Sequence, residues 1–159
     1  MSDSACLAAI AAVAENLAFL MPIGPGESDP ESWRVQIQVP WVGPDGSCGR
    51  IIVALDQGAA EATAANLLGL LPGESPASQD IEDACSEMAN VLAGNLLPVL
   101  YGIDHEFHLN PPEPTAEEPL HGPRVVRLAL VEGMIGVSIH GEADNSRILK
   151  AVRPVGPRA

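Results

Sequence analysis

The chain has 159 residues, which is enough for one domain with a single hydrophobic core. Its 21 acidic residues outnumber its 8 lysines and arginines, so the net charge at pH 7 is −13. A surface of that sign repels nucleic acid and anionic lipid, which argues against both as partners. Cys6, Cys48 and Cys85 have no metal-like spacing and are odd in number, which indicates reduced thiols in a cytoplasmic protein.

The first third of the chain predicts a helix followed by a β-hairpin. Apolar residues recur at helical spacing over residues 5–21, and Pro22 should end this helix. The stretch is short for a membrane span and has no positive residue before it, so we expect neither a span nor a signal peptide. Alternating apolar and polar residues over 33–39 predict a half-buried strand whose regular pairing ends at Pro40. A turn then leads into a returning strand, residues 49–55.

The middle of the chain predicts two helices. Asp56 should cap a helix over residues 57–71 that is rich in alanine. Ser75 and Pro76 are suited to begin the next helix, which extends to about residue 97 and is kinked or ended by Pro98.

The last third predicts three strands and a long loop. Residues 104–109 can form a short strand, and the acidic, proline-rich stretch 110–123 should contribute nothing to a core. Two further strands, 124–131 and 134–140, are joined by a tight turn. Residues 153–159 predict a loose tail, which leaves residues 1–152 as a single domain. This order of elements predicts an α+β fold: an antiparallel β-sheet covered by helices.

No metal site is expected in this chain. His105 and His108 lie three residues apart on a predicted strand, which places them on opposite faces. His121 and His140 are each expected to be isolated.

The second central helix has a polar face with an unusual composition. Asp83, Glu87, Asn90 and Gly94 fall on that face, within about 60° of one another. Any amphipathic helix has a polar face, but this one lacks the lysines and arginines that ordinarily pair with acids there. Gly94 costs about 1 kcal/mol of helix stability relative to alanine, yet it would let another protein's backbone come close.

This helix resembles the motif helix of the CheC/CheX/FliY chemotaxis phosphatases. Their motif has an Asp or Ser, a Glu four residues later and an Asn three residues after that. CheX-like members continue with two apolar residues and Ala-Gly-Asn, and a proline follows the next strand. Residues 83–95 (DACSEMANVLAGN) match this pattern, and Pro111 or Pro112 supplies the later proline. CheC-type members carry two motif helices, whereas this chain has one, so the resemblance is to a CheX-like member with a CheC/CheX-like fold.

The resemblance implies an enzyme that removes phosphate from the phosphoaspartate of a CheY-like receiver domain. Asn90 would orient the attacking water, and Glu87 would contact the active-site lysine of the receiver. Asp83 and Gly94 would belong to the partner-binding surface. The resemblance implies no cofactor of this chain's own, because the Mg²⁺ would be held by the receiver. It also implies a homodimer joined through the sheet.

Two other interpretations fit the same residues. The chain could be a receiver-binding or adaptor module that holds its partner without catalysis. It could also be a structural α+β protein whose match to the motif helix is accidental. Burial of Glu87 and Asn90 inside the fold would favour the accidental match.

Overall fold

The computed structural model describes residues 3–44, 46–102, 106–115, 120–122 and 124–141. The predicted tail and the domain boundary at residue 152 lie outside these residues. The elements in chain order are α1 (Asp3–Ala18), β1 (Pro22–Pro25), β2 (Val35–Val42), β3 (Cys48–Leu55), α2 (Gln57–Leu68), α3 (Ser78–Tyr101), β4 (His108–Leu109), β5 (Glu113–Pro114), β6 (Arg124–Leu130) and β7 (Met134–His140).

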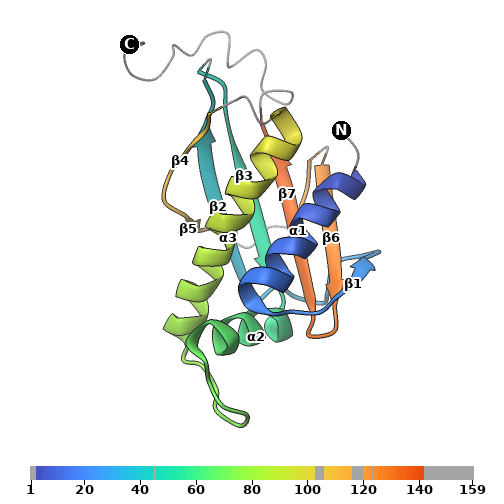
Figure 1. The fold of residues 1–159 in the computed structure, drawn as a ribbon, viewed down its shortest axis with the longest axis vertical. Coiled ribbons are helices and arrows are strands. Elements are labelled where there is room, and N and C mark those ends of the chain that lie inside the picture. The colour runs from blue at the N-terminus through green and yellow to red at the C-terminus, as the bar shows by residue number, and fades with distance from the viewer. Residues whose placement is uncertain (1–2, 45, 103–105, 116–119, 123, 142–159) are drawn as a thin grey trace.

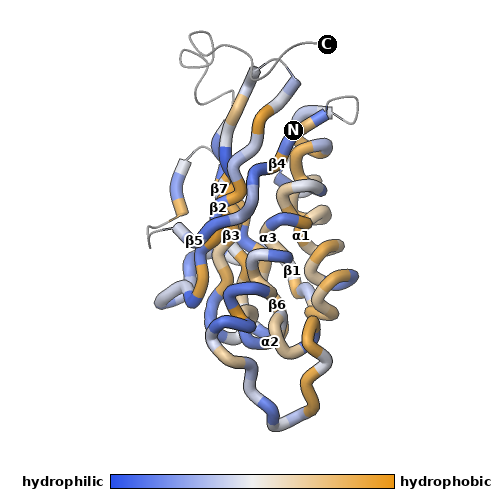
Figure 2. Tube along the Cα trace, turned by 90° about the vertical axis from the view of Figure 1, so that its left-hand side faces the viewer, coloured by the Kyte–Doolittle hydropathy of each residue, from blue (hydrophilic) through white to orange (hydrophobic). Residues whose placement is uncertain are grey.

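The strands form one antiparallel sheet with the order β1-β6-β7-β3-β2-β4, and β5 also pairs with β2. α1 and α3 lie side by side across one face of this sheet, and α2 lies near the end where α1 stops (Figure 1). Turned by 90°, the molecule shows the helices as a layer on one side of the sheet (Figure 2). The predicted α+β architecture is therefore confirmed.

The main core lies between the helices and the sheet. Alternate residues of the central strands point into it, and all of those named here are buried: Val35, Ile37, Val39, Trp41, Ile51, Val53, Leu55, Ile135, Val137 and Ile139. Burying a side chain of this size stabilises the fold by about 1.5–3 kcal/mol. This core fixes α3 on the sheet and so determines which side of α3 faces outward.

The sequence predicted that the pairing of β2 ends at Pro40, and this prediction is wrong. Pro40 pairs with Arg50 inside a continuous register that runs to Val42. The Pro40 carbonyl accepts a hydrogen bond from the Asn110 backbone N–H (2.8 Å), on the side of β4. The N and carbonyl groups of a strand residue point to the same side. The N–H that proline lacks is therefore missing only on the β4 side, and pairing with β3 is preserved.

α1 ends earlier than the apolar spacing predicts. It stops at Ala18, and Phe19 adopts a left-handed conformation with φ of 55°. The spacing of the apolar residues also predicts that Met21 lies on the apolar face of this helix, but Met21 is 60% exposed. The following residues form β1, which pairs with β6 and was not predicted.

The cap predicted for α2 is confirmed, but its end is not. The Asp56 carboxylate accepts a hydrogen bond from the Ala59 N–H (3.0 Å). The helix ends at Leu68 rather than residue 71, because Gly69 takes a left-handed conformation with φ of 68°.

The loop over residues 110–123 does contribute to a core, contrary to the sequence prediction. Leu120 is buried with Ile52 and Ala54 in a second, smaller cluster, against which Trp33 packs. This cluster covers the sheet face opposite the helices. Within the same segment, β5 pairs with β2.

His121 and His140 are not isolated, because their ring centroids lie 5.2 Å apart. His108 is exposed, and His105 lies outside the described residues. Among the residues that the structure describes, no helix is long and apolar enough to cross a membrane.

Candidate functional site

The candidate site lies on α3, which begins later and ends later than predicted. Ser75 and Pro76 precede the helix, and Ala77 occupies the N-cap position. Alanine has no side-chain oxygen, so the Asp80 carboxylate instead accepts a hydrogen bond from the Ala77 N–H (3.3 Å). Pro98 lies inside the helix, which continues to Tyr101.

One face of α3 is packed into the main core. Its buried residues recur at helical spacing: Ile81, Ala84, Cys85, Met88, Ala89, Leu92, Ala93, Leu96, Leu97 and Leu100. Because this face is anchored along its whole length, the residues of the opposite face have fixed positions.

The opposite face carries the predicted site residues. Asp83, Glu87 and Gly94 are exposed, and Asn90 is half-buried. A separation of three residues places Glu87 and Asn90 about one helical turn apart on the same face. Within the described part of the chain, no hydrogen bond or salt bridge engages the side chain of either residue. Both polar groups are therefore available to a partner molecule.

The carboxylate of the third predicted residue, Asp83, already has a hydrogen-bond partner within the chain. Its carboxylate accepts a hydrogen bond from the Gln79 side-chain amide (2.9 Å), one turn earlier on α3. This contact fixes the carboxylate against the helix surface, next to Glu87 in the i, i+4 position.

The surroundings of Gly94 do not require a glycine. A Cβ atom built there would meet only Leu109 Cδ1, at an ordinary contact distance of 3.8 Å. Pro98 has no N–H to donate to the Gly94 carbonyl, so this carbonyl lacks the usual i to i+4 hydrogen bond. The Gly94 end of the face thus has an open surface and a backbone acceptor. Leu109 of β4 borders it, which no local sequence signal indicated.

Asn95 falls toward the apolar side of the helix, and this position in the sequence predicts a bond to the backbone inside the fold. Its side-chain amide does donate to the backbone, to the Val91 carbonyl (2.7 Å). The residue is exposed, however, so its predicted place in the interior is wrong. The bond stays within α3 because the carbonyl one turn earlier is within reach of a short amide side chain.

The charge on α3 is entirely negative. The helix contains Asp80, Glu82, Asp83 and Glu87 and no lysine, arginine or histidine. A cation from outside the helix, Arg34, donates to the Ser78 hydroxyl at the start of the helix (3.3 Å). A partner that docks on this face would therefore be favoured by positive charge where it meets Glu87.

Cys85 lies on the packed side of α3 and cannot serve as a nucleophile. Burial raises the pKa of its thiol to about 12, and the charge of Arg34 opposes this only in part. At neutral pH the thiol is therefore protonated and shielded.

The sequence model of the chemotaxis phosphatase CheX family matches residues 41–126, which is more than half of the chain. The matched region runs from β2 to β6 and includes all of α3. The chain belongs to the CheX family. This membership excludes the interpretation in which the motif helix is an accidental match. A comparison with curated protein sequences finds no match.

Solved structures of chemotaxis proteins share the fold. The chemotaxis protein CheX from Vibrio vulnificus superposes with a TM-score of 0.67 at 20% identity, over 87% of this chain and 95% of that one. A putative chemotaxis protein from Desulfovibrio vulgaris Hildenborough gives a TM-score of 0.65 at 19% identity, with the same coverage. CheX from Borrelia burgdorferi, solved as a complex with CheY, BeF₃ and Mg²⁺, gives 0.60 at 20% identity, over 87% of this chain and 96% of that one.

The two candidates for the later proline of the motif lie between β4 and β5. Pro111 and Pro112 follow β4, whose Leu109 lies next to Gly94. The proline pair is thus close in sequence to a residue that borders the polar face of α3. Sequence spacing alone left open which proline corresponds to the family pattern, and both follow the strand after Asn110.

Proposed function

We propose that this chain accelerates hydrolysis of the phosphoaspartate in a CheY-like receiver domain, with Glu87 and Asn90 as the residues that act on it. The observation that carries the proposal is the position of these two residues. They lie one turn apart on the outward face of α3, and neither side chain is engaged within the described chain. Membership of a phosphatase family and the CheY complex of a CheX with this fold support it.

The proposed chemistry needs no nucleophile from this chain. An acyl phosphate is a reactive species, and a water molecule can attack its phosphorus directly. The bond between phosphorus and the aspartate oxygen breaks, which releases inorganic phosphate and restores the carboxylate. The water loses a proton to the phosphate or to solvent. The chain's contribution is to hold the water in line with the breaking bond.

Asn90 suits the positioning of water because an amide can both donate a hydrogen bond to an oxygen and accept one from it. Its half-buried position restricts the side chain more than full exposure would. A restricted amide loses less conformational entropy when it orders a water in the complex.

Glu87 is proposed to pair with the active-site lysine of the receiver. The carboxylate is exposed and has no cation beside it on α3, so it is free to accept such a contact. A charge-assisted hydrogen bond strengthens when docking excludes water. The Mg²⁺ that stabilises the phosphoryl group is proposed to be held by the receiver, and Asp83 and Gly94 to border the docked partner.

The decay of a phosphorylated CheY-like receiver, measured with substoichiometric protein, tests the proposal. The wild-type chain should shorten the lifetime of the phosphorylated receiver. Asn90→Ala should lower this rate about 100-fold, because an unpositioned water reacts much more slowly. The urea midpoint should stay close to that of the wild type, since the side chain makes no described hydrogen bond.

Asn16→Ala is the matched control, because Asn16 is an exposed asparagine on α1. It should keep the full rate. Receiver binding without any acceleration by the wild-type chain would show the adaptor function instead. Full activity of Asn90→Ala would contradict the role of the amide. The homodimer stays a prediction, which sedimentation equilibrium of the wild-type chain can test.

A further inference from the structure

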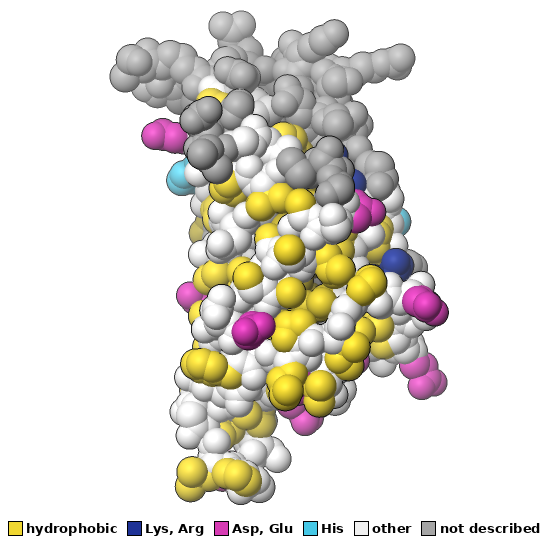
Figure 3. Space-filling view, turned by 45° about the vertical axis from the view of Figure 1, so that its right-hand side comes forward, with side chains coloured by type: hydrophobic (Ala, Val, Ile, Leu, Met, Phe, Trp, Pro, Cys, Tyr) yellow, Lys and Arg dark blue, Asp and Glu magenta, His cyan; other side chains and the backbone are white. Residues whose placement is uncertain are grey.

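One end of the molecule carries an exposed apolar patch apart from the Glu87 and Asn90 pair. Six large apolar side chains of the described chain are at least half exposed: Phe19, Met21, Ile23, Leu68, Leu71 and Val131. We call these six residues the α1-end patch. Three of them, Phe19, Met21 and Ile23, lie on the segment that follows α1. Leu68 is the last residue of α2 and Leu71 lies just after it, while Val131 lies in the turn between β6 and β7. Figure 3 views the side of α1, where apolar side chains gather on the surface.

Hydrogen bonds join the segments that carry the patch. The Val131 N–H donates to the Met21 carbonyl (2.9 Å), and the Asn66 side-chain amide donates to the Ala18 carbonyl (2.7 Å). The end of α1, the end of α2 and the β6–β7 turn are therefore held together. Exposed apolar residues that are clustered in this way mark a site of interaction more often than scattered ones do.

Phe19 occupies a position where folding alone would favour glycine. Its φ of 55° is left-handed, and its N–H donates to the Glu15 carbonyl (3.1 Å) where α1 ends. A bulky residue is disfavoured in this conformation, whereas glycine is not. Yet the ring is 70% exposed, so it gains little from packing against the fold. A strained, exposed aromatic ring of this kind suggests a role in binding.

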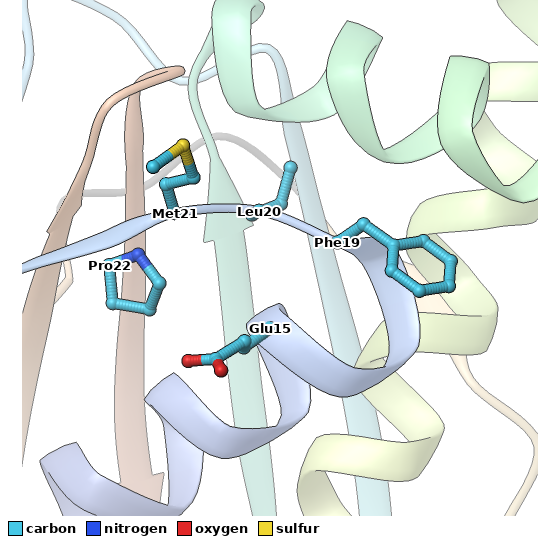
Figure 4. Close-up of a pocket in the computed structure, with 5 residues that line it drawn as sticks. All are labelled: Glu15, Phe19, Leu20, Met21 and Pro22. Carbon is cyan, nitrogen blue, oxygen red and sulfur yellow. The ribbon is translucent and has the colours of Figure 1, made fainter.

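A hollow of about 430 Å³ lies within the patch. Its lining is Glu15, Phe19, Leu20, Met21 and Pro22. Figure 4 shows the Glu15 carboxylate on the side of the Pro22 ring, with the Phe19 ring at the other end of the segment. Four apolar residues and one carboxylate therefore border the same space. No salt bridge engages Glu15 within the described residues.

Among the described residues, the charged side chains that line the hollow or hydrogen-bond to the patch are acidic. Besides Glu15, the Glu132 carboxylate accepts from the Met21 N–H (3.0 Å), and the Glu74 carboxylate accepts from the Leu71 N–H (2.9 Å). The arginines that the structure describes, Arg34, Arg50, Arg124 and Arg127, lie on or directly before sheet strands. The patch thus combines an apolar centre with an acidic rim.

We propose that the α1-end patch docks an amphipathic segment of a partner protein that carries lysine or arginine beside its apolar residues. Apolar side chains of the segment cover Phe19 and Met21, and a basic side chain lays its aliphatic stem in the hollow and its charge against Glu15. This docking does not depend on the proposed phosphatase activity.

The acidic rim disfavours two other occupants. A second copy of this chain would meet the patch across a two-fold axis, which would set one acidic rim against the other. An anionic lipid surface would be repelled by the same carboxylates. A basic protein segment is the occupant that complements both the apolar centre and the rim.

Binding of a synthetic peptide tests the proposal directly. The probe is a fluorescein-labelled 14-residue peptide of leucine and lysine, with the leucines at helical spacing on one face. Its control has the same composition in a scrambled order. The full-length wild-type chain should bind the patterned peptide at least tenfold more tightly than the scrambled one, measured by fluorescence anisotropy at physiological salt. Equal affinity for the two peptides would overturn the proposal.

Two variants locate the peptide. Phe19→Gly should weaken binding at least tenfold while the urea midpoint holds or rises, because glycine accepts the left-handed conformation. Glu15→Gln should weaken binding several-fold at low salt. Glu106→Gln removes an exposed charge that is not part of the patch, and it should leave the affinity unchanged. An equal loss in the two glutamate variants would show attraction by net charge alone and would overturn the proposal.

Two further measurements separate the other occupants. A dimer seen by sedimentation equilibrium that Phe19→Gly abolishes would assign the patch to a second copy. Binding to phosphatidylcholine vesicles with 30% phosphatidylserine that the same variant abolishes would assign it to lipid. Either result would overturn the proposal. Peptide binding that persists when receiver dephosphorylation is absent would separate this inference from the proposed function.

Discussion

Gly94 is a residue at which helix stability and the proposed docking role can be tested separately. Its position on α3 has room for a side chain, since a Cβ atom there meets only Leu109 at 3.8 Å. Gly94→Ala should therefore raise the free energy of unfolding by about 0.5–1 kcal/mol. If a receiver backbone docks against this position, the added methyl group should at the same time slow dephosphorylation. Urea denaturation and the receiver decay assay measure the two effects.

Gly133→Ala is the contrasting control. A Cβ atom at Gly133 would overlap Asp56 Oδ1 and lie 2.7 Å from the Ala59 nitrogen, the two atoms that form the cap of α2. This variant should lose stability, because the cap must move. Unchanged dephosphorylation in a stabilised Gly94→Ala would remove Gly94 from the proposed docking surface.

Cys85 makes the stability of the fold sensitive to alkaline pH. Its pKa is raised from 9.0 to about 12 by burial, so above pH 9 the unfolded chain loses a proton that the folded chain keeps. Titration of Cys85 leaves the free energy of unfolding unchanged below pH 9 and lowers it as the pH rises toward 12. By pH 10 the loss from this thiol should be about 1.4 kcal/mol.

Urea denaturation at pH 7 and pH 10 under reducing conditions measures this effect. The drop between the two values should be smaller in Cys85→Ala, which has no thiol to titrate at that position. The difference between the two chains isolates Cys85 from other groups that titrate in this range. An equal drop in both chains would contradict the buried, protonated thiol.

At the scale of elements, most helices and strands could be predicted from the sequence, but several ends could not. The period of apolar residues identifies α3 and β2 because burial selects one face. It does not identify where they stop. Pro40 stays within β2 because its missing N–H faces the side of β4, and that depends on which strand lies beside it. The tertiary structure decides which strand lies beside β2, and the local sequence does not predict it.

The segment over residues 110–123 illustrates the same limit. Its prolines and acids predict a loop without a core, yet Leu120 is buried against Ile52 and Ala54 on the outer face of the sheet. Leu120→Ala should therefore lower the free energy of unfolding by about 2–4 kcal/mol, as expected for a buried leucine. Urea denaturation measures the change. Leu71→Ala, at an exposed leucine, should change it by less than about 0.5 kcal/mol.

At the scale of the whole molecule, the sequence predicts the architecture and the candidate pair, but not the surfaces. The order of elements indicates an antiparallel sheet with helices on one face, and the polar side of α3 indicates Glu87 and Asn90. The α1-end patch has no such signature. Its residues come from positions 19–23, 68–71 and 131, and only the folded chain brings these segments together.

The two ends of the sheet have a consequence for self-assembly. One end is β1, a strand of four residues with Pro22 and Pro25, and the other is formed by β4 and β5, two residues each, with Pro114 in β5. Exposed strand edges recruit further strands from other chains, and short strands with prolines offer few N–H groups for this. The described edge strands thus offer few groups for growth into extended sheets. Any homodimer that uses the sheet should form through the face opposite the helices rather than by joining strands across the edges.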